Sequence, residues 1–280
     1  MATLEAGWGS HVIPSGVRDL QRFENLASQG SPFTFVRFSD GEIEILRNRK
    51  LIIAGGITEF RGIRFSNQFP EFDQKRFDPM RGQDIRHDLL ASAIFCEPNY
   101  FKGIPTRHNR ALDDREFMLR LNGGFTSQMT FSDLFLNSNF LSARQKFFPQ
   151  LVSRFQDLMV VGNWRCELKG YLEKGTLIRI PDNFFSSYQS TLKEVQTILQ
   201  GAPRSALILS SASSLSNVLG HRLRINRPDL TFLDIGTVLN DLLGLPLTTR
   251  AYHKLVNPRS LRDRFAAWRY RIHKEYQLQW

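Results

Sequence analysis

Cysteine is scarce in this sequence, and several familiar site patterns are missing. Cys96 and Cys166 are far apart, so we expect neither a disulfide framework nor a zinc knuckle, and a reducing compartment fits. The six histidines lack the H-x-H and H-E-x-x-H spacings of zinc sites. The sequence has no G-x-G-x-x-G, no G-x-x-x-x-G-K-[ST] and no G-x-S-x-G. These absences argue against the common dinucleotide, ATPase and Ser/His/Asp hydrolase sites.

Long apolar runs are also missing. None approaches the ~20 residues that a bilayer-spanning helix needs. Residues 1–16 lack the basic-then-apolar pattern of a signal peptide. We therefore expect a cytoplasmic protein, soluble or peripheral to the inner face of a membrane. The formal net charge of +10 favours anionic partners such as nucleotides, phosphorylated lipids, nucleic acid or an acidic membrane.

Apolar runs alternate with helical patterns in the C-terminal half. The expected strands are Leu158–Val161, Thr176–Ile180, Ala206–Leu209 and Leu230–Ile235. The helical patterns are Glu167–Lys174, Tyr188–Leu199 and Ala212–Leu223. Strands that alternate with helices imply right-handed βαβ crossovers, so we predict a Rossmann-like α/β fold with a mostly parallel sheet flanked by helices. Phenylalanine is common in the chain, and we expect most of it in the core.

The N-terminal half is less regular. Phe33–Phe38 reads as a strand and Ile43–Asn48 as a helix. Residues 58–81 are rich in Arg, Phe, Asn and Asp and are expected to form a loop, and residues 103–128 are similarly mixed. Long insertions of this kind often cover ligands, and ordinary surface loops are an equal alternative.

The segment from Arg37 to Glu42 carries the candidate site, because it lies at the carboxyl end of a strand, where α/β sheets bind ligands. The following helix N-terminus and Gly41 suit a phosphate, which Arg37 could also bind. Asp40 and Glu42 would place two hard oxygen ligands beside that phosphate, and Mg²⁺ or Mn²⁺ prefers such ligands. The alternative is structural, since Ser39-x-x-Glu42 is also a helix capping box.

Five segments carry motifs in a fixed order: VRFSDGEIEIL, DLMVVG, LIRIPDNFFSSYQSTLKEVQTIL, SALILSSASSLSNVLGHRL and TFLDIGTVLND. Together they resemble the GT-D fold glycosyltransferases, a family first described as a domain of unknown function. The first segment is similar to the family signature RFGDGE, the fourth to its strand–loop–helix with L-G-P-T-A, and the fifth to its closing D-I-G motif. The resemblance spans about residues 32–241.

The resemblance implies a metal-dependent hexosyltransferase of polysaccharide biosynthesis. It would use a nucleotide-diphosphate sugar, UDP-sugar first, and a glycan or lipid-linked saccharide acceptor. The family's D-x-E motif falls on Asp40 and Glu42, which would bind Mn²⁺ or Mg²⁺. Ser211-Ala212-Ser213-Ser214 replaces G-P-T-A, so hydroxyls would contact phosphate in place of glycine. Asp234-Ile235-Gly236-Thr237 replaces D-I-G-H, so any role of that histidine is absent.

Further site residues follow from the ends of the predicted strands. Asp234 would bind the sugar, position the acceptor or act as the catalytic base, and its alternative is a helix N-cap or an Asx turn. Ser211 and Ser213 lie at the N-terminus of another helix. The ordinary role there is to cap the helix, and the more specific hypothesis is that they bind an anion. The predicted substrate-binding residues are Arg37, Ser39, Gly41, Ser211, Ser213 and Gly236.

The C-terminal residues 257–280 are expected to form a basic amphipathic helix after a glycosyltransferase domain at 1–256. This helix would contact an anionic membrane or dock on the domain. The polar cluster Arg107–Arg110 would bind acceptor or form a solvated loop.

Two other classes of function stay open. One is a basic nucleic-acid-binding protein, although most phenylalanines sit in core-like patterns, so we do not expect nucleic acid as a partner. The other is a non-catalytic sugar-nucleotide-binding module of a larger synthase.

Overall fold

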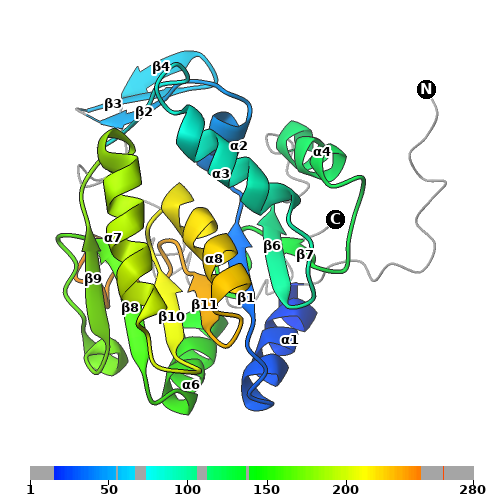
Figure 1. The fold of residues 1–280 in the computed structure, drawn as a ribbon, viewed down its shortest axis with the longest axis vertical. Helices are drawn as coiled ribbons and strands as arrows, with labels where there is room; N and C mark the ends of the chain where they lie inside the picture. The colour runs from blue at the N-terminus through cyan, green and yellow to red at the C-terminus, as the bar shows by residue number, and fades with distance from the viewer. Residues whose placement is uncertain are drawn as a thin grey trace.

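The computed structural model describes residues 16–54, 56–66, 74–105, 112–136, 139–246 and 261. Within these ranges the chain forms one sheet of seven strands and a second of four (Figure 1). The cluster Arg107–Arg110 lies outside the described residues, as does the expected helix at 257–280 apart from Leu261. None of the described helices combines the length and the apolarity that crossing a membrane would require.

The larger sheet is parallel throughout, in the order β7-β6-β1-β11-β10-β8-β9. Because all its strands run the same way, their carboxyl ends meet at one edge, and the predicted α/β class with a mostly parallel sheet is confirmed. The strands are β1 (Thr34–Arg37), β6 (Tyr100–Ile104), β7 (Met129–Phe131), β8 (Leu158–Asn163), β9 (Thr176–Ile180), β10 (Leu207–Ser210) and β11 (Thr231–Asp234).

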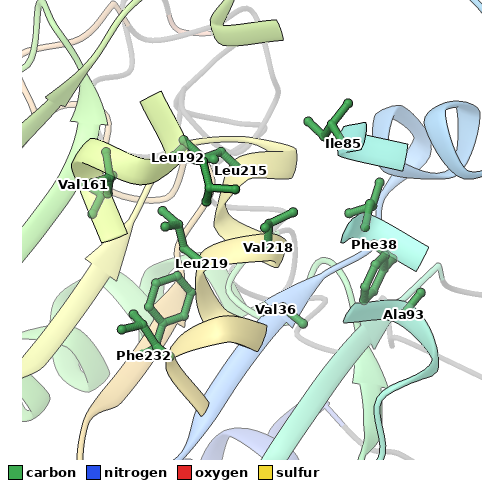
Figure 2. Packing of buried hydrophobic residues seen from close by; sticks show 14 of the residues in the cluster. Val36, Phe38, Ile85, Ala93, Val161, Leu192, Leu215, Val218, Leu219 and Phe232 are labelled. Atoms are coloured by element: carbon green, nitrogen blue, oxygen red, sulfur yellow. The ribbon is translucent and has the colours of Figure 1, made fainter. Parts of the chain in front are cut away.

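Alternate residues of each strand face opposite sides of this sheet, as the pleat requires. Val36 and Phe232 face a core that includes side chains of four helices, and Figure 2 shows Leu192, Leu215 and Leu219 packed there. These helices are α2 (Asp40–Leu46), α3 (Gln83–Ile94), α7 (Tyr188–Gln200) and α8 (Ser214–Asn226). A further helix, α4 (Leu112–Leu121), adds Met118 to the same core.

The opposite face of the sheet carries a phenylalanine-rich core. Phe23 lies 5.0 Å from Phe33 and 5.0 Å from Phe101, measured between ring centroids. Phe135 joins this cluster to Phe148, at 4.9 Å. The expected burial of phenylalanine is confirmed. The elements on this face are α1 (Gly16–Ser28), α5 (Phe140–Ser142), a π-helical turn (Ala143–Phe147) and α6 (Phe148–Arg154).

The loop predicted for residues 58–81 is wrong in its described part, because β3, β4 and β5 of a four-stranded antiparallel sheet overlap it. Its order is β4-β3-β2-β5. The strands are β2 (Leu51–Ala54), β3 (Ile57–Phe60), β4 (Ile63–Ser66) and β5 (Lys75–Phe77). Each is only three or four residues long and β4 is exposed throughout, so no clear alternation marks them in the sequence.

Three predicted helices differ in extent. The helix predicted at 43–48 is α2, which begins at Asp40, three residues earlier than expected, because Ser39 acts as its N-cap. The helix predicted at 212–223 is α8, Ser214–Asn226. The helix predicted at 167–174 reduces to a single 3₁₀ turn at Gly170–Leu172. A second 3₁₀ turn, Phe184–Ser187, precedes α7.

Candidate ligand-binding site

A cavity of about 820 Å³ lies along the carboxyl edge of the parallel sheet. Every strand of that sheet contributes a lining residue at its end or just beyond it: Arg37, Pro105, Ser132, Asn163, Ile180, Ser211 and Gly236. The antiparallel sheet forms another part of the wall, through Leu51, Ile53, Thr58, Phe60, Ile63, Phe65 and Lys75. Residues of both sheets therefore line the cavity.

Most of the sequence-predicted site residues meet in this cavity. The eight that line it are Arg37, Ser39, Asp40, Gly41, Glu42, Ser211, Ser213 and Gly236. Asp234 is buried next to Arg37 and is not among the lining residues. The parallel arrangement explains the gathering, since each of these segments directly follows a strand.

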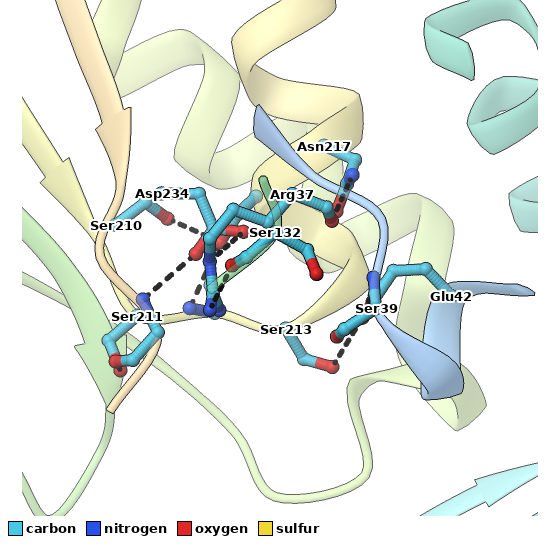
Figure 3. A network of polar contacts seen from close by, with 12 residues as sticks. Arg37, Ser39, Glu42, Ser132, Ser210, Ser211, Ser213, Asn217 and Asp234 are labelled. Carbon is cyan, nitrogen blue, oxygen red and sulfur yellow. Dashed lines mark hydrogen bonds and ion pairs between the residues drawn. The ribbon is translucent and has the colours of Figure 1, made fainter. Parts of the chain in front are cut away.

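Ser39 and Glu42 form the capping box that the sequence left open as an alternative. Oε2 of Glu42 accepts the Ser39 backbone N–H at 3.1 Å and the Ser39 hydroxyl at 2.7 Å. Ser213 Oγ, from the start of α8, lies 3.4 Å from Glu42 Oε1 (Figure 3). Glu42 therefore caps α2 and at the same time contacts the cavity.

Glu42 is only 7 % exposed. Burial raises its pKa, and the neighbouring Asp234 carboxylate raises this pKa further, while the hydrogen bond from Ser39 opposes the shift. Burial likewise raises the pKa of Asp234, and the Arg37 guanidinium opposes it. Two buried carboxyl groups thus lie close to one another at this edge of the sheet.

Asp40 differs from Glu42 because it is exposed at the cavity. Its Oδ1 accepts the Gly41 N–H at 3.2 Å. A Cβ atom added at Gly41 would meet Leu51 Cδ2 at an ordinary 3.7 Å and nothing closer. The fold itself therefore has room for a side chain at Gly41.

Arg37 is held in place from several sides (Figure 3). Its Nε lies 3.3 Å from Asp234 Oδ2, and its Nη1 donates to the Ser132 carbonyl at 3.3 Å. Asp234 Oδ1 also accepts the Gly236 N–H at 3.0 Å, which is the Asx turn that the sequence offered as an alternative. Asn217 Nδ2 donates to the Arg37 carbonyl at 2.7 Å.

Gly236 is required by this arrangement. It has a φ of +50°, and a Cβ there would overlap the guanidinium of Arg37. Its carbonyl accepts the Ser211 hydroxyl at 2.7 Å. The D-I-G segment therefore makes space for Arg37 and ties the ends of β10 and β11 together.

Sequence reasoning missed several polar residues of the cavity. Arg61 lies in the turn between β3 and β4 and is ion-paired with Asp114 of α4, which also lies 3.3 Å from Arg47. Asp182 accepts the Asn163 amide at 2.8 Å. An acidic residue in a first helical turn, such as Asp114, is indistinguishable in sequence from one placed there for the helix dipole.

A metal held entirely by protein is not supported within the described part of the chain, since no three His, Cys, Asp or Glu side chains gather there. Mg²⁺ commonly binds through one or two carboxylates together with substrate phosphates. Asp40 fits that role, since its carboxylate is exposed at the cavity. Glu42 is less available, because its two oxygens already contact Ser39 and Ser213.

The site and fold together define an α/β protein with a cavity across the carboxyl ends of a parallel sheet, the place where proteins of this class bind ligands. No family model and no curated protein matches the chain. Two solved structures do: a selenomethionine-substituted form of the domain of unknown function 1792, and the same domain described as having a distinct glycosyltransferase fold. Each has a TM-score of 0.50 at 15 % identity, over 81 % of this chain and 78 % of the solved chain. The chain therefore has a glycosyltransferase fold of this type.

Proposed function

We propose that this protein is a glycosyltransferase that moves a hexose from a nucleotide-diphosphate sugar to a saccharide acceptor. The observation that carries the proposal is the cavity at the carboxyl edge, which brings Arg37, Asp40 and Glu42 together. The fold around it is similar to that of a solved domain described as having a distinct glycosyltransferase fold. A UDP-sugar is our first candidate for the donor, on the resemblance of the sequence to the GT-D family.

The charges of the cavity support a divalent cation, Mn²⁺ or Mg²⁺, as cofactor. Among the described residues, three cationic side chains line the wall, Arg37, Arg61 and Lys75. Arg61 is ion-paired with Asp114 and Arg37 with Asp234, so these two are already partly neutralised. A diphosphate placed beside Asp40 would meet a carboxylate, which repels it unless a cation lies between them. Asp40 would hold that cation, with Glu42 as the second candidate ligand. When bound, the cation supplies charge neutralisation for the leaving diphosphate.

The remaining polar residues would bind and orient the donor. The Arg37 guanidinium, fixed by Asp234 and Ser132, offers a preset positive charge. The hydroxyls of Ser211 and Ser213 line the same cavity and suit phosphate oxygens. Asp234 as catalytic base stays a prediction, and its ion pair favours a positioning role through Arg37. If so, Asp234→Asn would weaken donor binding as well as transfer.

The apolar wall of the cavity bears on the acceptor. It comes mostly from the antiparallel sheet, through Leu51, Ile53, Phe60, Ile63 and Phe65. A purely polar glycan gains little from such a wall, whereas a lipid-linked saccharide buries apolar surface against it. Of the two acceptor classes predicted from the sequence, we favour the lipid-linked one. Contact with a membrane through residues 257–280 stays a prediction.

A thermal-shift screen of UDP-, GDP-, CMP- and TDP-sugars, with and without Mn²⁺, tests donor and metal together. We expect one nucleotide sugar to raise the melting temperature only when Mn²⁺ is present, because a ligand that binds the folded state stabilises it. The double variant Asp40→Asn, Glu42→Gln should lose this response. Glutamine can still cap α2, so the variant should stay folded.

The matched control is Asp113→Asn, which removes an exposed acid from the first turn of α4 outside the cavity. Its metal-dependent shift should equal that of the wild type. An undiminished shift in the double variant, or hexose transfer at a normal rate, would refute the assigned role of Asp40 and Glu42. Binding without turnover on any saccharide acceptor would instead favour a non-catalytic module.

A further inference from the structure

Asn240 is a polar residue of the cavity whose side chain has no hydrogen-bond partner among the described residues. It follows β11, is 1 % exposed and lies among the residues that line the cavity. Neither its Nδ2 nor its Oδ1 has a hydrogen-bond partner within the described structure. A buried amide without partners is unfavourable, because it has given up water and gained nothing in exchange. Such a residue therefore calls for an explanation in the function of the cavity.

The backbone around Asn240 is hydrogen-bonded on both sides and lies between buried residues. Its N–H donates to the Thr237 carbonyl at 3.3 Å, and its carbonyl accepts the Leu245 N–H at 2.8 Å. Leu239 and Leu243 on either side are fully buried. Asp241 is ion-paired with Arg144 of the π-helical turn. The segment holds the amide at the cavity as a preformed group.

A second asparagine of the cavity shows the contrast. The Nδ2 of Asn163 donates to Asp182 at 2.8 Å, and its Oδ1 accepts the Arg165 N–H at 3.1 Å. The Asn163 amide therefore has hydrogen-bond partners inside the protein, and it links the end of β8 to Asp182, which follows β9. Asn240 has the same side chain at the same cavity, without those partners.

We propose that Asn240 is a recognition residue for the donor and that its amide is satisfied by a neutral group offering a hydrogen-bond acceptor and donor side by side. This inference rests on the proposed glycosyltransferase function. An amide presents an N–H₂ donor next to a C=O acceptor, which matches such a group in both directions. Two parts of a nucleotide sugar carry this chemistry: the imide edge of a uracil base and a pair of hexose hydroxyls.

The decisive variant is Asn240→Leu, which keeps the size of the side chain and removes both polar atoms. In the free protein the leucine should raise the melting temperature, because it removes a buried amide that has no partner. The same variant should bind UDP-glucose with Mn²⁺ at least about tenfold more weakly than the wild type in isothermal titration calorimetry. A merely structural residue would not produce these opposite effects.

Two ligands distinguish the sources of the recognised group. If the amide binds the base, Asn240→Leu lowers the affinity for UDP and for UDP-glucose equally. If it binds the hexose, the affinity for UDP stays at the wild-type value and only the affinity for UDP-glucose falls. Asn240→Asp is the second variant, since it retains the shape and replaces the N–H₂ group with a carboxylate oxygen. It should lower the affinity for the same ligand or ligands.

Asn163→Leu is the matched control, and it should lower the melting temperature of the free protein because Asp182 loses a donor. The inference is overturned if Asn240→Leu also lowers the melting temperature and binds UDP-glucose with unchanged affinity. In that case wild-type binding still stands, so the proposed function survives. If the wild type binds no nucleotide sugar at all, the proposed function and this inference fall together.

Discussion

Buried ionisable side chains decide much of the chemistry at the residue scale. Glu42 and Asp234 both have raised pKa values because burial disfavours their charged forms. Binding of a metal requires the carboxylate form, so affinity for the metal proposed at this edge should increase with pH. Lys102 is the opposite case, a base buried in β6 away from the cavity residues.

Lys102 predicts a defined pH dependence of stability. Its Nζ donates to the Ala93 carbonyl at 3.2 Å and to the Asn122 side chain, and burial lowers its pKa from 10.5 to about 8. Between these values the folded protein binds fewer protons than the unfolded chain, so stability is lost as the pH falls toward 8. The stability of the wild type relative to Lys102→Met should rise with pH by up to about 1.4 kcal/mol per unit in this window.

Urea titrations at several pH values between 8 and 10 measure this difference. The control is Lys193→Met, at an exposed position of α7, which leaves Lys102 in place and should therefore retain the pH dependence that Lys102 causes. A flat difference for Lys102→Met would show that the ammonium group is solvated in the folded protein.

At the scale of elements, one hairpin turn connects the antiparallel sheet to the rest of the cavity. Arg61 and Gly62 between β3 and β4 both have positive φ, +54° and +74°. The Arg61 N–H donates to Glu44 Oε2 of α2 at 3.2 Å, and its guanidinium pairs with Asp114 of α4. These contacts hold the turn over the cavity and place Arg61 in its wall.

The backbone and the side chain of Arg61 can be tested separately. Glycine adopts positive φ freely, whereas alanine is strained there. We therefore expect Arg61→Gly to be more stable than Arg61→Ala by about 1 kcal/mol in urea denaturation. Both variants lack the guanidinium, so both should bind the proposed nucleotide-sugar donor with the same reduced affinity in calorimetry. Equal stability of the two variants would mean that the turn relaxes to another conformation.

At the scale of the whole molecule, one parallel sheet separates two cores that differ in composition. The core beneath α7 and α8 is largely aliphatic in Figure 2, while the opposite core contains a phenylalanine cluster. Phe135 links this cluster across the sequence, with ring centroids 5.2 Å from Phe35 and 5.4 Å from Phe147. The cluster can form only when segments far apart in the chain have assembled.

Phe135→Ala tests how much the fold depends on this cluster. The residue is 1 % exposed, so the substitution leaves a cavity as well as losing apolar burial, and we expect a cost of about 3–5 kcal/mol. Phe65→Ala in β4 is the comparison, since Phe65 is 44 % exposed and should cost less than about 1 kcal/mol. Urea denaturation measures both. Similar costs at the two positions would contradict the assigned core.

The sequence by itself determined the parallel sheet and much of the site. Buried parallel strands are continuous apolar runs, as in β10, and the bounds predicted for the edge strand Thr176–Ile180 are those observed. The carboxyl ends of parallel strands share one edge, so the sequence alone places Asp40, Ser213 and Gly236 together, and all three line the cavity. The sequence also indicates the capping box and the Asx turn, because each is formed by hydrogen bonds between residues only a few positions apart.

Only the tertiary structure decided what covers that edge. The antiparallel sheet has short strands without clear alternation, so its place over the cavity, with Arg61 in the wall, depends on contacts with α2 and α4. The burial of Asn240 depends on packing against distant segments, and so does the position of Asp234 next to Arg37. Sequence patterns report local backbone preference and the periodicity of burial, whereas these positions are set by contacts between residues far apart in the chain.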